Sequence, residues 1–151
     1  MGVEIERKFL VKDLTAVLKE EGIPCKQGYL SVDLDRSVRV RVAGGLAYLT
    51  VKGASRGMSR TEFEYEIPLA DAERMLADTC IQPILLKTRY TLGEWEVDVF
   101  HGENEGLVIA EFELSSDCQV IEIPDWVGED VTDDKNYYNA VICTNPYSRR
   151  S

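Results

Sequence analysis

The chain of 151 residues is long enough for one domain with a substantial core, and we interpret residues 1–151 as a single domain. It carries 27 Asp and Glu against 17 Lys and Arg, and the formal net charge of −10 argues against nucleic acid or an anionic membrane as a partner. Four cysteines without a CxxC pair and a single histidine argue against a Cys/His zinc site. Since there is no apolar leader and no long hydrophobic span, we expect a cytoplasmic protein with reduced thiols.

Turn residues divide the sequence into eight short runs that are typical of β-strands. These runs cover residues 2–11, 27–35, 37–43, 46–53, 60–69, 84–92, 94–100 and 107–114. Gly44 and Gly45 lie between two alternating runs and predict a two-residue hairpin, because a type I′ turn needs positive φ at both positions. Helical patterns at residues 13–22, 70–79 and 132–143 interrupt or follow the strands.

Charged and apolar residues alternate along these strands, and each strand carries largely one sign of charge. Glu4, Glu6 and Lys8 share one face of residues 2–11, whereas the opposite face is mainly apolar. The ionic faces together carry Glu4, Glu6, Lys8, Arg39, Arg41, Lys52, Glu62, Glu64, Lys87, Arg89, Asp98, Glu111 and Glu113. A merely solvated face would mix Thr, Ser and charges of both signs, so the segregation of charge favours a binding surface.

Eight antiparallel strands are enough to close a barrel and remove its exposed edges. We therefore predict an α+β fold that is mainly antiparallel β, an eight-stranded closed β-barrel with a few flanking helices. If the apolar face packs outward against the helices, the ionic face lines the interior, where a dry core would be costly for every ion. Such an interior should hold water and ligand. Lys and Arg suit phosphate oxygens and clustered carboxylates suit Mg²⁺ or Mn²⁺, so the pattern predicts a site for a metal-complexed polyphosphate.

Several short motifs then carry a family resemblance. Residues 4–8, EIERK, supply the ExExK motif of the CYTH superfamily, also called triphosphate tunnel metalloenzymes. The similarity continues through RVR (39–41), TVKG (50–53), SRTEFEYEI (59–67), KTRY (87–90), EVDVF (96–100), AEFEL (110–114) and VGEDVTDDKNYYN (127–139). It covers nearly the whole chain and implies an eight-stranded antiparallel barrel whose tunnel binds triphosphate compounds with divalent metal.

Within this family, the compact length, the EIERKFLV opening and the segment KQGYL (26–30) are most similar to bacterial inorganic triphosphatases, which hydrolyse tripolyphosphate to pyrophosphate and phosphate. The resemblance implies Mg²⁺ or Mn²⁺, with two ions when substrate is bound. The implied metal ligands are Glu4, Glu6, Glu62, Glu64, Glu111 and Glu113. The implied phosphate-binding residues are Lys8, Arg39, Arg41, Lys87, Arg89 and, closing one end, Lys135. Asp98 would orient neighbouring basic side chains or join the metal shell.

The resemblance also implies in-line attack of water on a terminal phosphorus, with Tyr29 and Lys52 as a pair of groups that activates the water. A hydrogen bond within the barrel is the alternative for Tyr29, and plain phosphate binding is the alternative for Lys52. A class IV adenylate cyclase or a thiamine triphosphatase could use the same scaffold, and a non-enzymatic polyphosphate- or nucleotide-binding module is a further alternative. The expected partner is a small triphosphate compound. The sequence leaves monomer and homodimer open.

Overall fold

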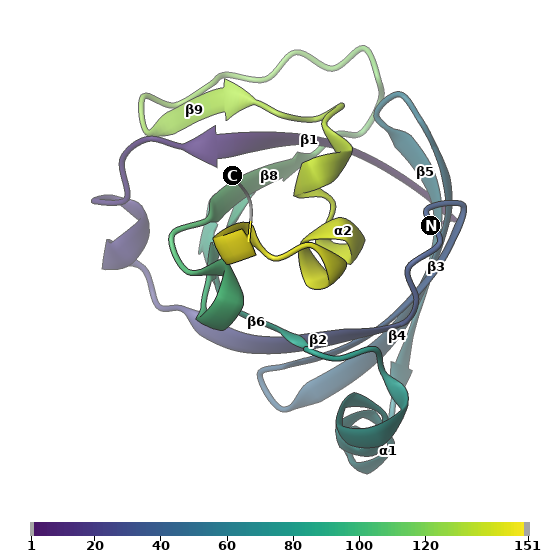
Figure 1. Cartoon of the computed structure of the whole chain (residues 1–151). Coiled ribbons are helices and arrows are strands. Elements are labelled where there is room, and N and C mark those ends of the chain that lie inside the picture. The colour runs from purple at the N-terminus through teal and green to yellow at the C-terminus, as the bar shows by residue number, and fades with distance from the viewer. Residues whose placement is uncertain (1, 150–151) are drawn as a thin grey trace.

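The computed structural model describes residues 2–149, and within this range nine strands form one antiparallel sheet. The strands are β1 (Gly2–Val11), β2 (Ile23–Ser31), β3 (Arg36–Ala43), β4 (Leu46–Arg56), β5 (Ser59–Ile67), β6 (Leu85–Leu92), β7 (Trp95–Phe100), β8 (Val108–Glu113) and β9 (Val127–Asp130). Their order is β5-β4-β3-β2-β6-β7-β8-β1, and β1 also pairs with β5. Eight strands therefore close into the predicted barrel (Figure 1).

Strand β1 is shared between the barrel and β9. Residues 2–5 pair with β5, residues 6–10 pair with β8, and Phe9 and Val11 pair with β9. Strand β9 therefore lies outside the closed ring, beside the C-terminal half of β1 (Figure 1). The sequence pattern did not predict β9, which is only four residues long.

Two strands differ from prediction by three or more residues at a boundary, and the other predicted strands by no more than two. The strand expected at 27–35 runs instead over Ile23–Ser31, because Asp33 turns the chain: its carbonyl accepts a hydrogen bond from Arg36 N, and its Oδ1 accepts one from Asp35 N. Strand β4 continues beyond residue 53 to Arg56. The hairpin at Gly44 and Gly45 is confirmed, with φ of 60° and 83°.

None of the three helical patterns forms one continuous α-helix. Residues 13–22 form only the 3-10 turn η1 (Val17–Lys19), because fully buried Val17 anchors this short connection to the outer face of the barrel. The pattern at 70–79 becomes α1 (Leu69–Arg74), which continues as the π-helical turn η2 (Met75–Thr79). The pattern at 132–143 divides at Tyr138, whose ψ of 135° is extended, into η4 (Lys135–Tyr137) and α2 (Asn139–Thr144). Two further 3-10 turns are η3 (Gly102–Asn104) and η5 (Tyr147–Arg149).

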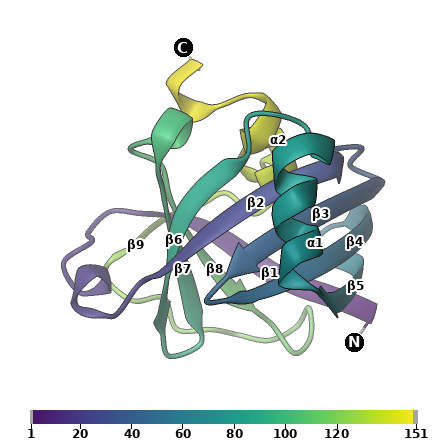
Figure 2. The same cartoon turned by 90° about the horizontal axis from the view of Figure 1, so that it is seen from below.

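Apolar side chains cover the outside of the barrel as expected. Helix α1 lies along the outer face of β3 and β4 (Figure 2), where Ala72 and Leu76 pack against Val40 and Ala47. On the opposite wall, Trp95 contacts three aromatic rings at centroid distances of 5.1 to 5.6 Å. Burial of these surfaces holds the charged faces of the strands inward.

One end of the barrel interior is apolar, which the alternation of charged and apolar residues did not predict. Leu85, Phe100 and Ile109 share the inward face of their strands with charged residues, yet they form a buried cluster with Ala140 and Ile142 of α2. Figure 1 shows α2 inside the ring of strands. The interior is therefore divided into an apolar end filled by α2 and an ionic end that remains hollow.

Candidate active site

The ionic part of the barrel encloses a cavity of about 290 Å³. All of the predicted metal-ligand glutamates line it, as do both predicted catalytic residues and most of the predicted phosphate-binding residues. The lining residues include Glu4, Glu6, Lys8, Tyr29, Arg39, Arg41, Lys52, Arg60, Glu62, Glu64, Arg89, Glu96, Glu111, Glu113, Thr132, Tyr138 and Asn139. Each of the eight barrel strands contributes at least one of them.

Strand register brings the charges together. Glu6 lies opposite Glu113 and Lys8 lies opposite Glu111 across the β1–β8 pair, while Lys52 lies opposite Glu62 across the β4–β5 pair. Side chains of directly opposed residues lie close enough to interact. The cavity lining is therefore a direct result of period-two alternation in neighbouring strands.

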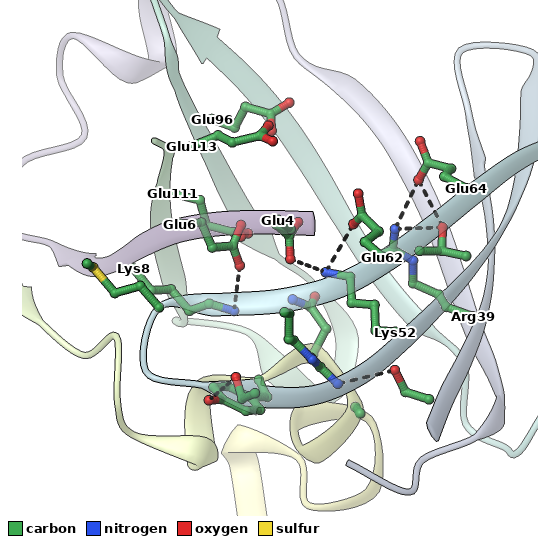
Figure 3. A pocket seen from close by; sticks show the side chains of 18 of the residues that line it. Glu4, Glu6, Lys8, Arg39, Lys52, Glu62, Glu64, Glu96, Glu111 and Glu113 are labelled. Atoms are coloured by element: carbon green, nitrogen blue, oxygen red, sulfur yellow. Dashed lines mark hydrogen bonds and ion pairs between the residues drawn. The ribbon is translucent and has the colours of Figure 1, made fainter. Parts of the chain in front are cut away.

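Carboxylates gather on one side of the cavity, above Lys8 and Lys52 in Figure 3. Burial and the charge of Glu111 raise the pKa of Glu6 well above its ordinary value. Burial also raises the pKa of Glu111, but the charge of Lys8 and a hydrogen bond with Glu6 outweigh it and lower the pKa to about 2. The pKa values of Glu6 and Glu111 thus shift in opposite directions, because the two carboxylates lie close together and Lys8 favours the charged form of Glu111.

Lys52 links two further carboxylates. Its Nζ lies 2.8 Å from Oε1 of Glu4 and 3.5 Å from Oε2 of Glu62. Burial opposes ionisation of Glu4, but the charge and hydrogen bond of Lys52 outweigh it and lower the pKa of Glu4. The pKa of Glu62 is raised by burial and by the charge of Glu4. We refer to this side of the cavity, formed by Glu4, Glu6, Glu62, Glu111 and Glu113, as the acidic wall. The ammonium group of Lys52 is held within it.

Two arginines of β3 form a basic wall that has few anions. Arg39 and Arg41 each lie 3.5 Å from Oε2 of Glu64, which also accepts a hydrogen bond from Thr50. Burial, together with the charges of Arg39 and Arg89, lowers the pKa of Arg41. Arg39 Nε is buried and has no hydrogen-bond partner among residues 2–149. Two crowded guanidinium groups that share one carboxylate keep free N–H donors, such as Arg39 Nε, and are suited to bind an anion with several oxygens.

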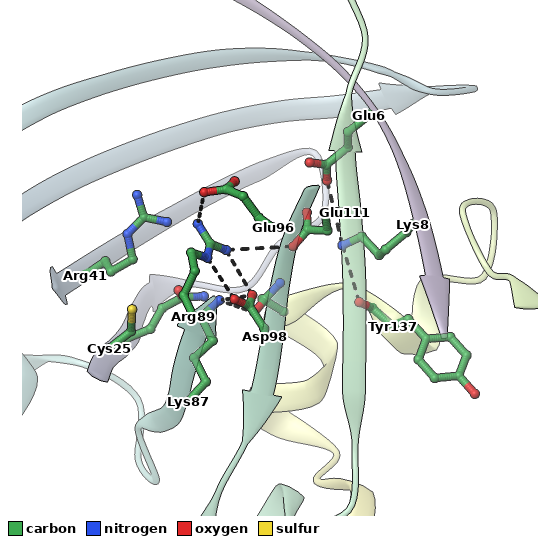
Figure 4. Close-up of polar contacts among 12 residues, drawn as sticks. Glu6, Lys8, Cys25, Arg41, Lys87, Arg89, Glu96, Asp98, Glu111 and Tyr137 are labelled. Carbon is green, nitrogen blue, oxygen red and sulfur yellow. Dashed lines mark hydrogen bonds and ion pairs between the residues drawn. The ribbon is translucent and has the colours of Figure 1, made fainter. Parts of the chain in front are cut away.

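Behind this basic wall, Asp98 binds the cationic side chains of Lys87 and Arg89 (Figure 4). It accepts hydrogen bonds from Lys87 Nζ at 2.8 Å and from Arg89 Nε and Nη2 at 2.8 and 2.9 Å. Burial raises the pKa of Asp98, but Lys87 and Arg89 outweigh it and hold the pKa far below its ordinary value. Arg89 reaches the cavity, whereas Lys87 and Asp98 are buried and do not line it. Burial lowers the pKa of Lys87 to about 8 despite Asp98.

Two other predicted residues occupy different surroundings. Tyr29 lines the cavity, and its Oη accepts a hydrogen bond from Gln27 Nε2, whereas the Lys52 ammonium contacts Glu4 and Glu62. Lys135 lies on η4 with an exposed side chain and is not among the lining residues.

A family model described as the CYTH domain matches residues 2–140. The chain belongs to the CYTH family. An inorganic triphosphatase of Acetivibrio thermocellus is 48% identical to this CYTH protein in an alignment 151 positions long that covers 97% of each chain. An inorganic triphosphatase of Nitrosomonas europaea is 35% identical over 148 residues, covering 92% of this chain and 95% of that protein. A crystal structure of an inorganic triphosphatase matches with a TM-score of 0.64 at 33% identity, covering 92% of this chain and 96% of its own.

Several lining residues of the CYTH cavity were missed from the sequence. Arg60 shares the inward face of β5 with Glu62 and Glu64, so the same alternation could have identified it. Its Nε donates to the carbonyl oxygen of Gly53 at 2.8 Å, and its guanidinium lies 5.7 Å from the ring of Tyr138. Thr132, Tyr138 and Asn139 come from the C-terminal segment, and no strand pattern points to them.

The CYTH cavity offers the oxygen donors that a hard divalent cation requires, but it has no complete cage. Within residues 2–149, no group of three or more His, Cys, Asp or Glu side chains is arranged to hold a metal ion. Mg²⁺ is usually held by one or two carboxylates together with substrate phosphates, so a complete protein cage is not expected. The close carboxylate pair of Glu6 and Glu111 fits such a partial site. Across the same range, no helix has the length and apolar character needed to cross a membrane.

Proposed function

We propose that this CYTH protein is an inorganic triphosphatase that hydrolyses tripolyphosphate to pyrophosphate and phosphate inside the barrel. The observation that carries the proposal is the meeting of an acidic wall and a basic wall around one cavity inside the barrel. Tripolyphosphate is a small, highly charged chain, and it requires both walls: cations to bind its oxygens, and carboxylates to bind its metal. The 48% identity with an inorganic triphosphatase supports the same activity.

Glu4, Glu6, Glu62, Glu64, Glu111 and Glu113 would hold Mg²⁺ or Mn²⁺ directly or through water. Bound metal would neutralise phosphate charge and lower the pKa of a nearby water. Two ions with substrate bound would match the number of carboxylates, and substrate oxygens would complete each coordination shell.

The basic residues would bind and orient the phosphates. Arg39, Arg41 and Arg89 present planar guanidinium groups that match phosphate oxygens, and Lys8 adds a compact charge on the acidic side. Asp98 fixes Arg89 through two hydrogen bonds, so it would act as a supporting residue. Lys87 would support the same arrangement from behind, since its ammonium is fully buried against Asp98. Lys135 is exposed and does not line the cavity, so it would contact phosphate only if the substrate extended beyond the lining residues at one end of the tunnel.

Catalysis would require a water aligned with the terminal phosphorus and groups that handle its proton. Lys52 would take part in this proton transfer, because ion pairs with the carboxylates of Glu4 and Glu62 hold its ammonium group in the cavity. Tyr29 lines the cavity and would donate a hydrogen bond to an oxygen within it.

The other enzymatic readings need room for an organic group. Adenylate cyclase must accommodate adenosine, and thiamine triphosphatase must accommodate thiamine. The cavity of about 290 Å³ has a mainly charged lining, which favours the inorganic substrate. A binding module would show the same cavity and differ only in lacking turnover.

The test is release of phosphate and pyrophosphate from tripolyphosphate, ATP and thiamine triphosphate, each with Mg²⁺, with Mn²⁺ and with a chelator. We expect metal-dependent phosphate release from tripolyphosphate at the highest kcat/KM. Glu111→Gln is the inactive comparison, and the exposed Glu105→Gln is its matched control. Cyclic AMP from ATP would replace the proposal with a cyclase, and tight binding without turnover would replace it with a binding module.

A further inference from the structure

Gln27 is a fully buried polar residue that does not line the cavity. It lies on β2, opposite Arg41 of β3 and Leu85 of β6, with none of its surface exposed. Its Nε2 donates a hydrogen bond of 3.2 Å to Tyr29 Oη. Its Oε1 is buried and has no hydrogen-bond partner among residues 2–149.

Stability of the fold does not explain an amide side chain at this position. A buried amide oxygen without a partner is destabilising, and an apolar side chain of similar shape would avoid the loss. The contact that Gln27 does make is directed at Tyr29, which lines the cavity two residues along the same strand. The site, rather than the core, therefore accounts for the amide.

The hydrogen bond decides where the phenol proton of Tyr29 can go. A phenol carries one proton and accepts through its lone pairs, and Gln27 occupies the accepting side. Apolar Leu85, Phe100 and Ile109 pack in the same cluster as the Tyr29 ring and accept no hydrogen bond. Arg39, which pairs with Tyr29 across β2 and β3, and Lys8, whose charge interacts with Tyr29, have only donors. Within residues 2–149 the Tyr29 hydroxyl accepts from Gln27 and donates no hydrogen bond, so its proton is available to an oxygen that enters the cavity.

We propose that Gln27 is a positioning residue that, by donating to Tyr29 Oη, directs the Tyr29 O–H toward an oxygen of the bound triphosphate. This inference rests on the proposed triphosphatase function. Tyr29 is the group that touches substrate, and Gln27 acts through it. The interaction is strongest when the transferring phosphoryl group carries its greatest oxygen charge, so loss of alignment should reduce kcat more than it raises KM.

The experiment compares Gln27→Met, Tyr29→Phe and the double variant in tripolyphosphate hydrolysis. We expect Gln27→Met to lower kcat by roughly tenfold and to leave KM within about a factor of two, because misalignment of one donor costs less than its removal. Tyr29→Phe should lower kcat by roughly a hundredfold. The double variant should match Tyr29→Phe, since Gln27 has no other route to the substrate.

Stability separates this role from a structural one. Gln27→Met should melt at the wild-type temperature or higher, because it removes an unsatisfied buried oxygen. Lys26→Met changes the adjacent, outward-facing residue of β2, whose ion pair with Glu73 is exposed, and should leave kcat unchanged. The inference would be overturned if Gln27→Met kept the wild-type kcat, or if the losses of kcat added up in the double variant. It would also be overturned if the loss of kcat in Gln27→Met accompanied a lower melting temperature. Wild-type protein without turnover would instead contradict the proposed function.

Discussion

Replacing Asp98 with Asn tests whether the buried ion cluster is needed for the fold. Asn has nearly the same shape, but it removes the negative charge that faces Lys87 and Arg89. Three charge-assisted hydrogen bonds end on Asp98, at 2.8 to 2.9 Å, and the Lys87 side chain is completely buried. Breaking one partner of a buried pair costs about 3–5 kcal/mol, because the remaining charge is left in a nonpolar environment.

The assay is urea and thermal unfolding at pH 7, followed by tryptophan fluorescence. For a domain of this size, the expected cost corresponds to a melting temperature roughly 6–20 °C lower. Lys87→Met is the companion variant, since it leaves Asp98 bound to Arg89 and should cost clearly less. The exposed Asp35→Asn should remain within about 0.5 kcal/mol of wild type.

Acid titration supplies a second readout with a defined sign. Because Lys87 and Arg89 outweigh burial and lower the pKa of Asp98 below 3.8, the ionised carboxylate stabilises the folded protein above pH 3.8. This stability is lost as the pH falls through the lower, folded-state pKa. The difference between wild type and Asp98→Asn should therefore narrow below pH 3.8. A variant within about 1 kcal/mol of wild type at neutral pH, or a difference that stays constant in acid, would refute the reasoning.

Three further predictions concern the cavity. Arg41→Met should raise KM for tripolyphosphate roughly tenfold, measured by steady-state kinetics, because it removes charge-assisted hydrogen bonds to phosphate; an unchanged KM would contradict this role. Lys52→Met should lower kcat by roughly a hundredfold or more while calorimetry still detects substrate binding, and retained turnover would assign Lys52 to binding alone. Metal affinity should fall as the pH falls through the raised pKa of Glu6, because metal displaces its proton; calorimetry in buffers of different ionisation enthalpy should show proton release that Glu6→Gln abolishes.

Alternation of side chains was sufficient to predict the barrel and the inward direction of its charges. Period-two patterning identifies a face of a strand, but it does not give the depth of a residue along the barrel axis. Lys87 and Arg89 share the inward face of β6, yet only Arg89 reaches the cavity, because Lys87 lies nearer the apolar end filled by α2. For the same reason, the sequence could not show that Gln27 lies behind Tyr29.

Regular structure outside the barrel was less predictable. The helical spacing of Leu14, Val17 and Leu18 yields one 3-10 turn, because burial of Val17 against the barrel outweighs a weak helix preference. Strand β9 has four residues, which is too few for an alternating pattern, and it exists because β1 offers a free edge there. In both segments, tertiary contacts determine the local conformation.

The shared strand β1 also has a consequence for how the chain matures. Closure joins residues 2–5 to β5 and residues 6–10 to β8, and the β1–β8 pairs lie 99 to 107 positions apart in the sequence. Non-local pairing of this kind slows folding, and during synthesis the first strand must wait for the eighth to emerge. Glu4, Glu6 and Lys8 meet Glu111 and Glu113 only at that moment, so the ability to bind a ligand would report completion of the barrel.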